Sequence, residues 1–328
     1  MSAELGASIA LVFLAGIAGV AMPMLGMRGL WPSLEGGSTT TSNYRGVEIG
    51  HGLGAVWLMW AMSVLAFAFV SVVIGEVMGE GIATMAGLVW ATGAMLVLAA
   101  FAFGLVDDVF GDTDARGFRG HLRAMVSGRL TTGGLKLVGI GVASAAAGAV
   151  GPLLSIQWGW GSPAPWWVHW IMATLAIALT ANLVNLMDLR PGRALKAYVF
   201  LAGIAIAAMA ASAWFASEGA GISRAMTVAL VASLLTLGPV LAVWRYDLGE
   251  RGMLGDAGAN AMGALAGFLL ASSLPVWGLG AYVVIVLAFN ILSEKVSFSR
   301  VIEGNTLLRW IDGLGRLKDV DTRKDGAI

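Results

Sequence analysis

The stretch GIATMAGLVWATGAMLVLAAFAFGLVDD, residues 81–108, is an uncharged apolar run that ends in two adjacent carboxylates, Asp107 and Asp108. About 20 consecutive apolar residues are enough to cross the roughly 30 Å hydrocarbon core of a bilayer. The run is therefore predicted to form a membrane-spanning helix that carries an acidic pair at one end.

The composition of the whole chain agrees with this prediction. Its 328 residues are 58% hydrophobic and 12% charged, and the mean hydropathy is +0.82. A soluble domain of this size does not have such a composition, so we predict an all-α integral membrane protein. The net charge is zero and gives no indication of a nucleic-acid partner. The chain has no cysteine, which excludes disulfides, thiolate metal sites and a cysteine nucleophile.

Nine apolar runs are long enough to be predicted as spans of a polytopic bundle. The first run lacks a basic segment before it and is too long for a signal peptide, so we expect it to be retained. The nine runs lie at 5–30, 52–75, 81–106, 134–154, 166–187, 194–216, 223–243, 258–274 and 276–293.

The charges between the runs predict the orientation. One side of the membrane would hold 19 of the 20 Lys and Arg residues, and only Arg224 would lie on the other side. The positive-inside rule then places the N-terminus outside and the C-terminus in the cytoplasm, which agrees with an odd number of spans. We expect a multi-pass protein of a bacterial plasma membrane, with its polar segments at the cytoplasmic face.

Residues 299–318, SRVIEGNTLLRWIDGLGRLK, place apolar side chains among charges at roughly helical spacing. This pattern predicts an amphipathic helix on the cytoplasmic membrane surface. We therefore divide the chain into a transmembrane domain, residues 1–298, and a cytoplasmic helix with its tail, residues 299–328. The last ten residues are expected to be disordered.

The stretch from residue 104 to residue 136, which follows the third span, contains ten ionisable side chains. Carboxylates beside clustered positive charge suit a divalent cation and phosphate groups, since Mg²⁺ prefers one or two carboxylates together with phosphate oxygens. The alternative is a solvated charged loop. The ionisable side chains are Asp107, Asp108, Asp112, Asp114, Arg116, Arg119, His121, Arg123, Arg129 and Lys136.

Two other segments place polar groups at the ends of spans. Asn182, Asn185 and Asp188 lie on one stripe at the end of the fifth span, where polar groups are costly if they face lipid. The asparagines suit polar contacts between helices as well as a functional site. Asp256 follows a glycine at the start of the eighth span, where it suits either an ordinary N-cap or a metal site near bound phosphate. The loop from Asn43 to His51 is expected to be a plain loop.

Four segments, GLVDDVFG, LTTGGLKLVG, NLVNLMDL and LGDAGANAMG, occur in this order along the chain. They resemble the ordered signatures of the polyprenyl-phosphate N-acetylhexosamine-1-phosphate transferases. This superfamily includes phospho-MurNAc-pentapeptide translocase and the GlcNAc-1-phosphate transferases of cell-envelope synthesis. The resemblance covers residues 43–293.

The resemblance implies roles for the matching residues. Asp107 would be a base on the lipid phosphate, and both it and Asp108 would lie near Mg²⁺, or Mn²⁺ in its place. Lys136 would hold phosphate, and Asp256 with Asp108 would bind the metal. The cleft for the nucleotide-sugar would be lined by Asn182, Asn185 and Asp188, and we add Arg45, His121, Arg190 and Arg193 as candidate substrate-binding residues.

The implied reaction transfers a sugar-1-phosphate from a nucleotide-sugar, UDP-linked by expectation, to polyprenyl phosphate in the bilayer. The chain departs from the family at Leu189–Arg193, where a glycine-rich acidic continuation is usual, and it lacks the histidine-rich stretch of the last cytoplasmic loop and a tenth span. We hypothesise that Arg190, Arg193, Glu294, Lys295 and Arg300 replace the lost donor contacts.

Three other functions are alternatives to this transferase reaction. A non-catalytic relative that binds polyprenyl phosphate and regulates or scaffolds envelope synthesis would explain the departures from the family. A transporter would be expected to carry charges near mid-membrane. The segment DTDAR at 112–116 suggests a CDP-alcohol phosphotransferase, but the glycine-spaced downstream aspartates of that family are absent. The sequence leaves the oligomeric state open, a homodimer included.

Overall fold

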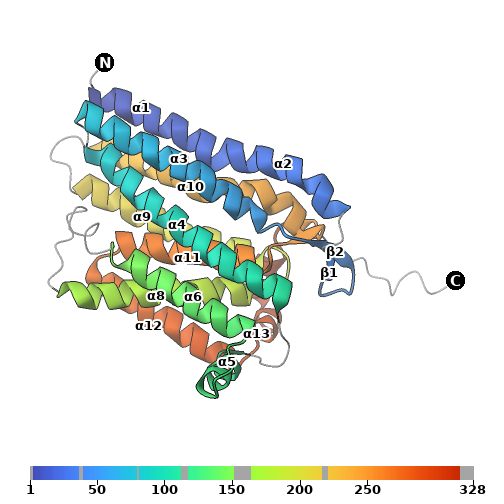
Figure 1. The fold of residues 1–328 in the computed structure, drawn as a ribbon. Coiled ribbons are helices and arrows are strands. Elements are labelled where there is room, and N and C mark those ends of the chain that lie inside the picture. The colour runs from blue at the N-terminus through green and yellow to red at the C-terminus, as the bar shows by residue number, and fades with distance from the viewer. Residues whose placement is uncertain are drawn as a thin grey trace.

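The computed structural model describes residues 3–36, 40–79, 81–111, 117–150, 164–215 and 221–317. It is an all-α bundle of long, roughly aligned helices (Figure 1). Within the described residues, seven helical segments are long and apolar enough to cross a membrane. They are Leu5–Glu35, Ala55–Val77, Ala83–Phe110, Trp166–Met187, Arg193–Phe215, Ile222–Leu248 and Val276–Ser293. The chain is therefore a polytopic membrane protein, as its composition predicts.

Each of the nine predicted runs overlaps a helix in the part of the chain that the structure describes. Seven of them correspond to the apolar segments above, which belong to α1–α2, α3 (Ala55–Met78), α4 (Gly81–Phe110), α8 (Trp166–Met187), α9 (Arg193–Phe215), α10 (Gly221–Leu248) and α12 (Val276–Ser293). The other two runs correspond to α6 (Thr132–Gly148), which has 17 residues, and to α11 (Gly255–Ser273).

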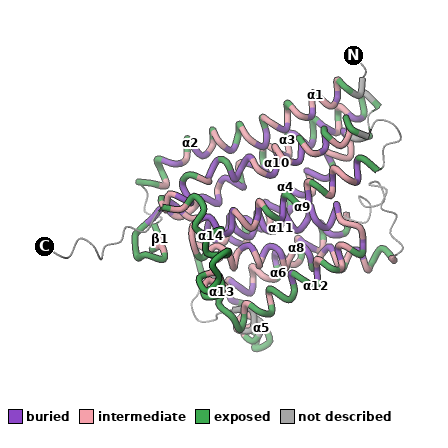
Figure 2. The backbone as a smooth tube through the Cα atoms, turned by 180° about the vertical axis from the view of Figure 1, so that it is seen from behind, coloured by how far each residue is buried: buried purple, intermediate pink, exposed green. Residues whose placement is uncertain are grey.

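Helix α11 lies at the centre of the bundle. All of its residues except Asp256 are buried (Figure 2). It packs against α4, α8 and α9. Small residues allow this close packing: a methyl group at Gly263 would lie 2.8 Å from the Cα atom of Ala181, and one at Gly267 would lie 2.8 Å from the Cα atom of Ile177. Close approach through glycine is typical of helix packing in membranes.

The first predicted span is one helical rod with a wide turn in its middle. It consists of α1 (Ala3–Ala15), the π-helical segment η1 (Gly16–Ala21) and α2 (Met22–Glu35). Gly19 of this segment lies against the backbone of α10 at Leu234 and Leu235. A π-helix usually occurs in this way, as a single turn inside a longer α-helix.

The loop from Asn43 to His51, which was expected to be a plain loop, takes part in a small sheet. Strand β1 (Thr40–Ser42) pairs antiparallel with β2 (Glu48–His51), and β2 pairs parallel with β3 (Gly252–Met253). The strands have only two to four residues each, which is too short to produce a recognisable alternation of apolar and polar residues. This sheet joins the loop after α2 to the segment that precedes α11.

The predicted C-terminal amphipathic helix is divided into two helices, α13 (Phe298–Gly304) and α14 (Thr306–Gly313). Asn305 separates them, because its side chain accepts hydrogen bonds from the amides of Leu307 and Leu308 and so begins a new helix. Several large apolar side chains of α14 are exposed, including Leu307 and Trp310. The predicted disordered tail, 319–328, lies outside the described residues. A further short helix, α5 (Gly117–Val126), precedes α6.

Candidate functional site

Lys136 is the centre of a charged cluster formed by three helices. Its Nζ atom lies 2.6 Å from Oδ2 of Asp107 on α4, and it also contacts Oδ2 of Asp256 on α11. All three side chains are partly shielded from solvent, with exposed fractions of 17% for Lys136 and Asp107 and 30% for Asp256. The structure thus brings together a lysine and two carboxylates that are far apart in the sequence.

Asp108 lies beside this cluster and caps helix α11. Its two carboxylate oxygens accept hydrogen bonds from the amides of Asp256 and Ala257, each at 2.9 Å. The sequence suggested Asp256 itself as an ordinary N-cap, but the capping carboxylate comes from α4. A negative charge at the start of a helix satisfies unpaired amides and interacts favourably with the helix dipole.

Gly104 makes the approach of α4 to α11 possible. A methyl group at this position would lie 2.5 Å from the carbonyl oxygen of Asp256 and 2.6 Å from the Cα atom of Ala257. Contacts this short do not occur between real atoms, so a larger residue would push the two helices apart. Because Gly104 lies one turn before Asp107 and Asp108, it sets how close both carboxylates come to α11.

Asp188 lies at the C-terminal end of α8, near the same acidic cluster. Shielding from water, together with the nearby carboxylates of Asp247, Asp256 and Asp108, raises the pKa of Asp188 well above its usual range. A hydrogen bond from the backbone of Gly255 acts in the opposite direction on this pKa. Asp188 is therefore an acidic neighbour of the cluster.

A pocket of about 240 Å³ opens beside Lys136. Of the residues predicted to bind substrate, His121, Asn182 and Asn185 line it. Asn260, Ser293 and Glu294 also line it, and Glu294 was among the residues expected to contact the donor. The pocket therefore combines one cation with several groups that form hydrogen bonds.

His121 is held over the first turn of α6. Its Nδ1 atom lies 2.8 Å from the hydroxyl oxygen of Thr131, which also caps α6 by accepting a hydrogen bond from the amide of Gly134. The ring occupies the space that a side chain at Gly133 would need. Of the other ionisable residues predicted in this stretch, Asp112, Asp114 and Arg116 lie outside the described residues.

Asn182 has a structural role in addition to its place in the pocket. Its amide donates a hydrogen bond of 2.7 Å to the side chain of Asn290 on α12. Asn290 in turn donates to the carbonyl oxygen of Leu179 at 3.1 Å. These bonds join α8 to α12, which is the polar contact between helices that the sequence left as an alternative for the asparagines.

Three residues predicted to bind substrate lie outside this pocket, and two of them, Arg45 and Arg190, lie around Tyr44. Arg45 and Arg190 each place a guanidinium group over the Tyr44 ring, 5.3 and 5.0 Å from its centre. Arg45 also pairs with Glu250, and Arg190 pairs with Glu303. Arg193 binds the C-terminal segment, as described next. None of the three lines the pocket beside Lys136.

Arg193 attaches the C-terminal helices to the start of α9. Its Nε and Nη2 atoms donate hydrogen bonds of 2.6 and 3.0 Å to the two carboxylate oxygens of Asp312, and its Nη1 donates to Ser299. Both side chains of the ion pair are buried, with exposed fractions of 4% and 9%. Two-point contact between arginine and a carboxylate is strong and directional. Arg193 thus positions the segment that follows α12.

We expect Asp312→Ala to release α14 from the bundle. Removing the carboxylate leaves the buried guanidinium of Arg193 unpaired, at a cost of about 2 to 3 kcal/mol. Hydrogen exchange of residues 306–313 would measure the release. Glu303→Gln is the matched control, because the pair of Glu303 with Arg190 is half exposed and should contribute less than about 1 kcal/mol. Equal protection of α14 in wild type and Asp312→Ala would contradict the expectation.

The same ion pair predicts a dependence on acidity. Burial acts to raise the pKa of Asp312, but hydrogen bonds from Arg193 and the nearby Arg316 lower it below its usual range overall. Because the folded-state pKa is lower than the unfolded value of about 3.9, the stabilisation is complete above that value. It is lost as the pH falls through the folded-state pKa, so protection of α14 should fall only in acid.

The carboxylates of the cluster offer oxygen atoms that suit a divalent cation. Among the described residues, no group of three or more His, Cys, Asp or Glu side chains is arranged to hold a metal ion. Asp107 and Asp256 nevertheless both reach one nitrogen atom, that of Lys136, and each has hard oxygen donors of the kind that Mg²⁺ prefers. The chemistry of this pair fits Mg²⁺ together with phosphate oxygens. The sequence predicted Asp256 and Asp108 as the metal ligands. Both carboxylate oxygens of Asp108, however, accept hydrogen bonds from backbone amides of α11.

Sequence reasoning missed three polar residues near the site. Asn260, which is 2% exposed, donates a hydrogen bond of 2.8 Å to the carbonyl oxygen of Asp256. Asn290 joins α12 to α8, and His51 contacts Asp108. The apolar runs around Asn260 and Asn290 could have singled them out, because a buried amide in a span needs a partner.

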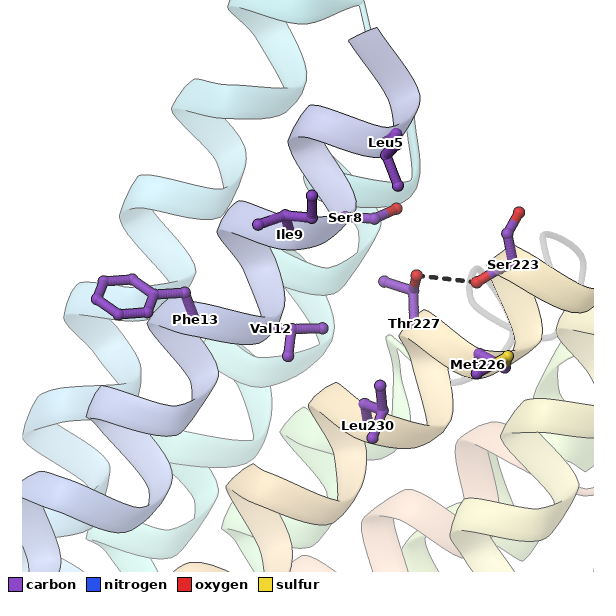
Figure 3. Close-up of a pocket in the computed structure, with 9 residues that line it drawn as sticks. All are labelled: Leu5, Ser8, Ile9, Val12, Phe13, Ser223, Met226, Thr227 and Leu230. Carbon is purple, nitrogen blue, oxygen red and sulfur yellow. Dashed lines mark hydrogen bonds between the residues drawn. The ribbon is translucent and has the colours of Figure 1, made fainter. Parts of the chain in front are cut away.

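A larger cavity of about 570 Å³ lies between the start of α1 and the start of α10, at the other end of the bundle (Figures 1 and 3). Its walls are mainly apolar, and its polar side chains are those of Ser8, Ser223 and Thr227. The Thr227 hydroxyl donates a hydrogen bond to the carbonyl oxygen of Ser223 within α10 (Figure 3). Among the described residues that line this cavity, none is charged and none was predicted to be functional.

No family model and no curated protein matches the chain. The functional assignment therefore rests on the geometry of this site.

Proposed function

We propose that the protein transfers a sugar-1-phosphate from a nucleotide-sugar to polyprenyl phosphate at the cytoplasmic face of a bacterial plasma membrane. The chain would then be a divergent polyprenyl-phosphate N-acetylhexosamine-1-phosphate transferase of cell-envelope synthesis. The observation that carries the proposal is the placement of Lys136 between Asp107 and Asp256 at the edge of a polar pocket. These residues belong to three of the four segments that resemble the family.

The arrangement suits phosphoryl transfer between two anionic substrates. Such a reaction needs positioned cations that offset developing charge, and it needs little covalent chemistry from the protein. Lys136 would exchange a carboxylate partner for a substrate phosphate, and Asp107 would accept the proton of the lipid phosphate. His121, Asn185 and Asn260 would orient the donor by hydrogen bonds in the pocket.

Mg²⁺ would be held by Asp107 and Asp256, and when bound it would supply positive charge to the phosphate groups. Asp108 would act on the site by fixing the start of α11, because both of its oxygens accept backbone amides. Asn182 and Asp188 would support the pocket from α8. Arg45, Arg190 and Arg193 would act outside it, by holding the C-terminal segment and the loop that contains Tyr44.

We also propose that nine helices span the membrane, with the N-terminus outside and the site inside. Of the two that are shorter or less apolar, α11 would cross surrounded by other helices, and α6 would cross beside α4 and α8. Since the chain has no cysteine, single cysteines can be introduced without background labelling. We expect Ser127→Cys and Asn305→Cys to react with a membrane-impermeant maleimide only in inverted vesicles, and Ala164→Cys only in right-side-out vesicles. The opposite pattern would contradict the orientation.

A second candidate function is a non-catalytic protein that binds polyprenyl phosphate and regulates or scaffolds envelope synthesis. It is favoured by the use of Arg190 and Arg193 in holding the C-terminal segment, since these residues were expected to contact the donor. It requires Lys136 to bind the lipid phosphate without turnover.

A release assay separates the two functions. Purified protein would receive undecaprenyl phosphate and each of several UDP-sugars, with and without Mg²⁺. The transferase predicts UMP release that needs lipid, metal, Asp107 and Asp256, with Asp107→Asn and Asp256→Asn as inactive variants. Binding of undecaprenyl phosphate with no UMP release for any donor would support the non-catalytic function instead.

A further inference from the structure

His51 lies at the end of strand β2, where the small sheet fixes its backbone. His51 is the register partner of Met253 in the parallel pair of β2 and β3. The amide of Gly50 donates to the carbonyl oxygen of Arg251 at 3.2 Å, and the amide of Leu53 donates to that of Met253 at 3.1 Å. The histidine is therefore held beside the segment that leads into α11.

The imidazole of His51 points to the start of α11. Its Nε2 atom lies 3.6 Å from Oδ1 of Asp108. Gly255, which has a φ of 68°, makes room for it: a methyl group at Gly255 would lie 2.5 Å from His51 Nε2 and 2.8 Å from Oδ2 of Asp108. Both the missing side chain and the left-handed backbone of Gly255 thus keep this space for the imidazole.

Asp108 does not need His51 to hold its position. Its two oxygens already accept amides of α11 at 2.9 Å, and the 3.6 Å contact is too long for a hydrogen bond. Within the described residues, no hydrogen bond to the His51 ring is found. The His51 side chain is 24% exposed, so a ligand can reach the imidazole from solvent. The ring can therefore donate a hydrogen bond to a ligand at the edge of the charged cluster.

The excess of negative charge in the cluster also indicates that a bound phosphate needs a second hydrogen-bond donor in addition to Lys136. Asp107, Asp108 and Asp256 contribute three carboxylates, while Lys136 is the one cation among the described side chains that contacts two of them. A phosphate that approaches these carboxylates is repelled unless positive charge and hydrogen-bond donors face it, and Mg²⁺ held by Asp107 and Asp256 would leave the side of Asp108 without either. His51 lies on the side of Asp108, with its Nε2 atom 3.6 Å from Oδ1 of that residue, whereas Lys136 lies on the side of Asp107.

We propose that His51 binds a substrate phosphate by donating the hydrogen of its imidazole Nε2, beside Asp108 at the start of α11. This inference rests on the proposed function, because it requires the cluster to receive a phosphate. The phosphate can belong to the lipid or to the nucleotide-sugar, and the chemistry of the contact is the same for both.

The test compares His51→Leu, which removes the donor, with His51→Gln, which restores an N–H group at similar reach. Binding to the purified full-length protein in Mg²⁺ would be measured for undecaprenyl phosphate and for UDP-GlcNAc. Undecaprenol, which lacks the phosphate, and uridine serve as ligand controls. We expect His51→Leu to weaken one phosphate ligand about tenfold, His51→Gln to recover most of the loss, and the controls to bind equally to all three proteins.

The two phosphate ligands identify the source. A loss confined to undecaprenyl phosphate assigns His51 to the lipid phosphate, and a loss confined to UDP-GlcNAc assigns it to the donor. Unchanged binding of both by a folded His51→Leu protein would overturn the inference, even if wild type turns over. Conversely, wild type without turnover but with phosphate binding that depends on His51 would end the transferase proposal and support the inference. Wild type that binds neither ligand would overturn both.

Discussion

Replacing Lys136 with methionine is expected to lower kcat for sugar-1-phosphate transfer by about two to three orders of magnitude, the usual effect of removing a group that stabilises developing charge. Lys136 contacts both Asp107 and Asp256, so its loss leaves two carboxylates facing an incoming phosphate. The measurement is the rate of UMP release at saturating donor and lipid, with thermal unfolding as the check that the variant is folded.

Lys136→Arg is the matched variant for this prediction. It keeps the positive charge, but its planar guanidinium cannot replace an ammonium group that is shared between carboxylates of two different helices. We expect kcat of Lys136→Arg to lie between those of wild type and Lys136→Met. A folded Lys136→Met protein with wild-type kcat would show that this lysine has no part in the reaction.

Asp108→Ala is expected to lower the free energy of unfolding by about 2 to 3 kcal/mol, because it removes the acceptor of two amides at the buried start of α11. The effect should be large for a single polar residue, since α11 is the central helix and both hydrogen bonds are 2.9 Å long. Denaturant unfolding in detergent would measure it.

Asp108→Asn separates stability from function. Its side-chain oxygen can accept one of the two amides, so about half of the lost stability should return. Its activity should remain low, because the start of α11 that carries Asp256 would no longer be held at both amides. If Asp108→Ala unfolds at the same denaturant concentration as wild type, the capping role assigned to Asp108 is wrong.

The spans were predictable because their signal is simple. A long apolar run such as residues 81–106 has no alternative to burial in lipid or in a core, and it coincides with α4. Helix α11 shows the limit of this reasoning. Its sequence is rich in glycine and alanine, so its role as the central, fully surrounded helix depends on close contacts at Gly263 and Gly267 with another segment.

The charged cluster was predictable in part. Asp107, Lys136 and Asp256 could be selected because each is an ionisable residue at the end of an apolar run, and the structure brings them into contact. Arg190 and Arg193 were selected for their charge and for their place after the fifth span, and neither feature can distinguish a substrate contact from an ion pair. Their partners, Glu303 and Asp312, lie more than one hundred residues away in the sequence.

The structure of the C-terminal segment and the position of His51 could not be predicted, because both depend on local contacts that the pattern of apolar and polar residues does not reveal. One asparagine at position 305 divides the expected amphipathic helix, because its side chain caps the second half. His51 was included in a plain loop, since strands of two to four residues produce no recognisable period. Its contact with Asp108 exists because β2 pairs with β3, a segment about 200 residues further along the chain.

The central claim is that the chain moves a sugar together with its phosphate onto a lipid phosphate. The most direct measurement uses UDP-sugar labelled with ³²P in its β-phosphate, given to purified wild type and Lys136→Met in the presence of undecaprenyl phosphate and Mg²⁺. We predict label in the lipid fraction, with equimolar unlabelled UMP in water, and both products formed about two to three orders of magnitude more slowly by Lys136→Met. Sugar in the lipid fraction without ³²P, or no transfer from any donor, would contradict the claim.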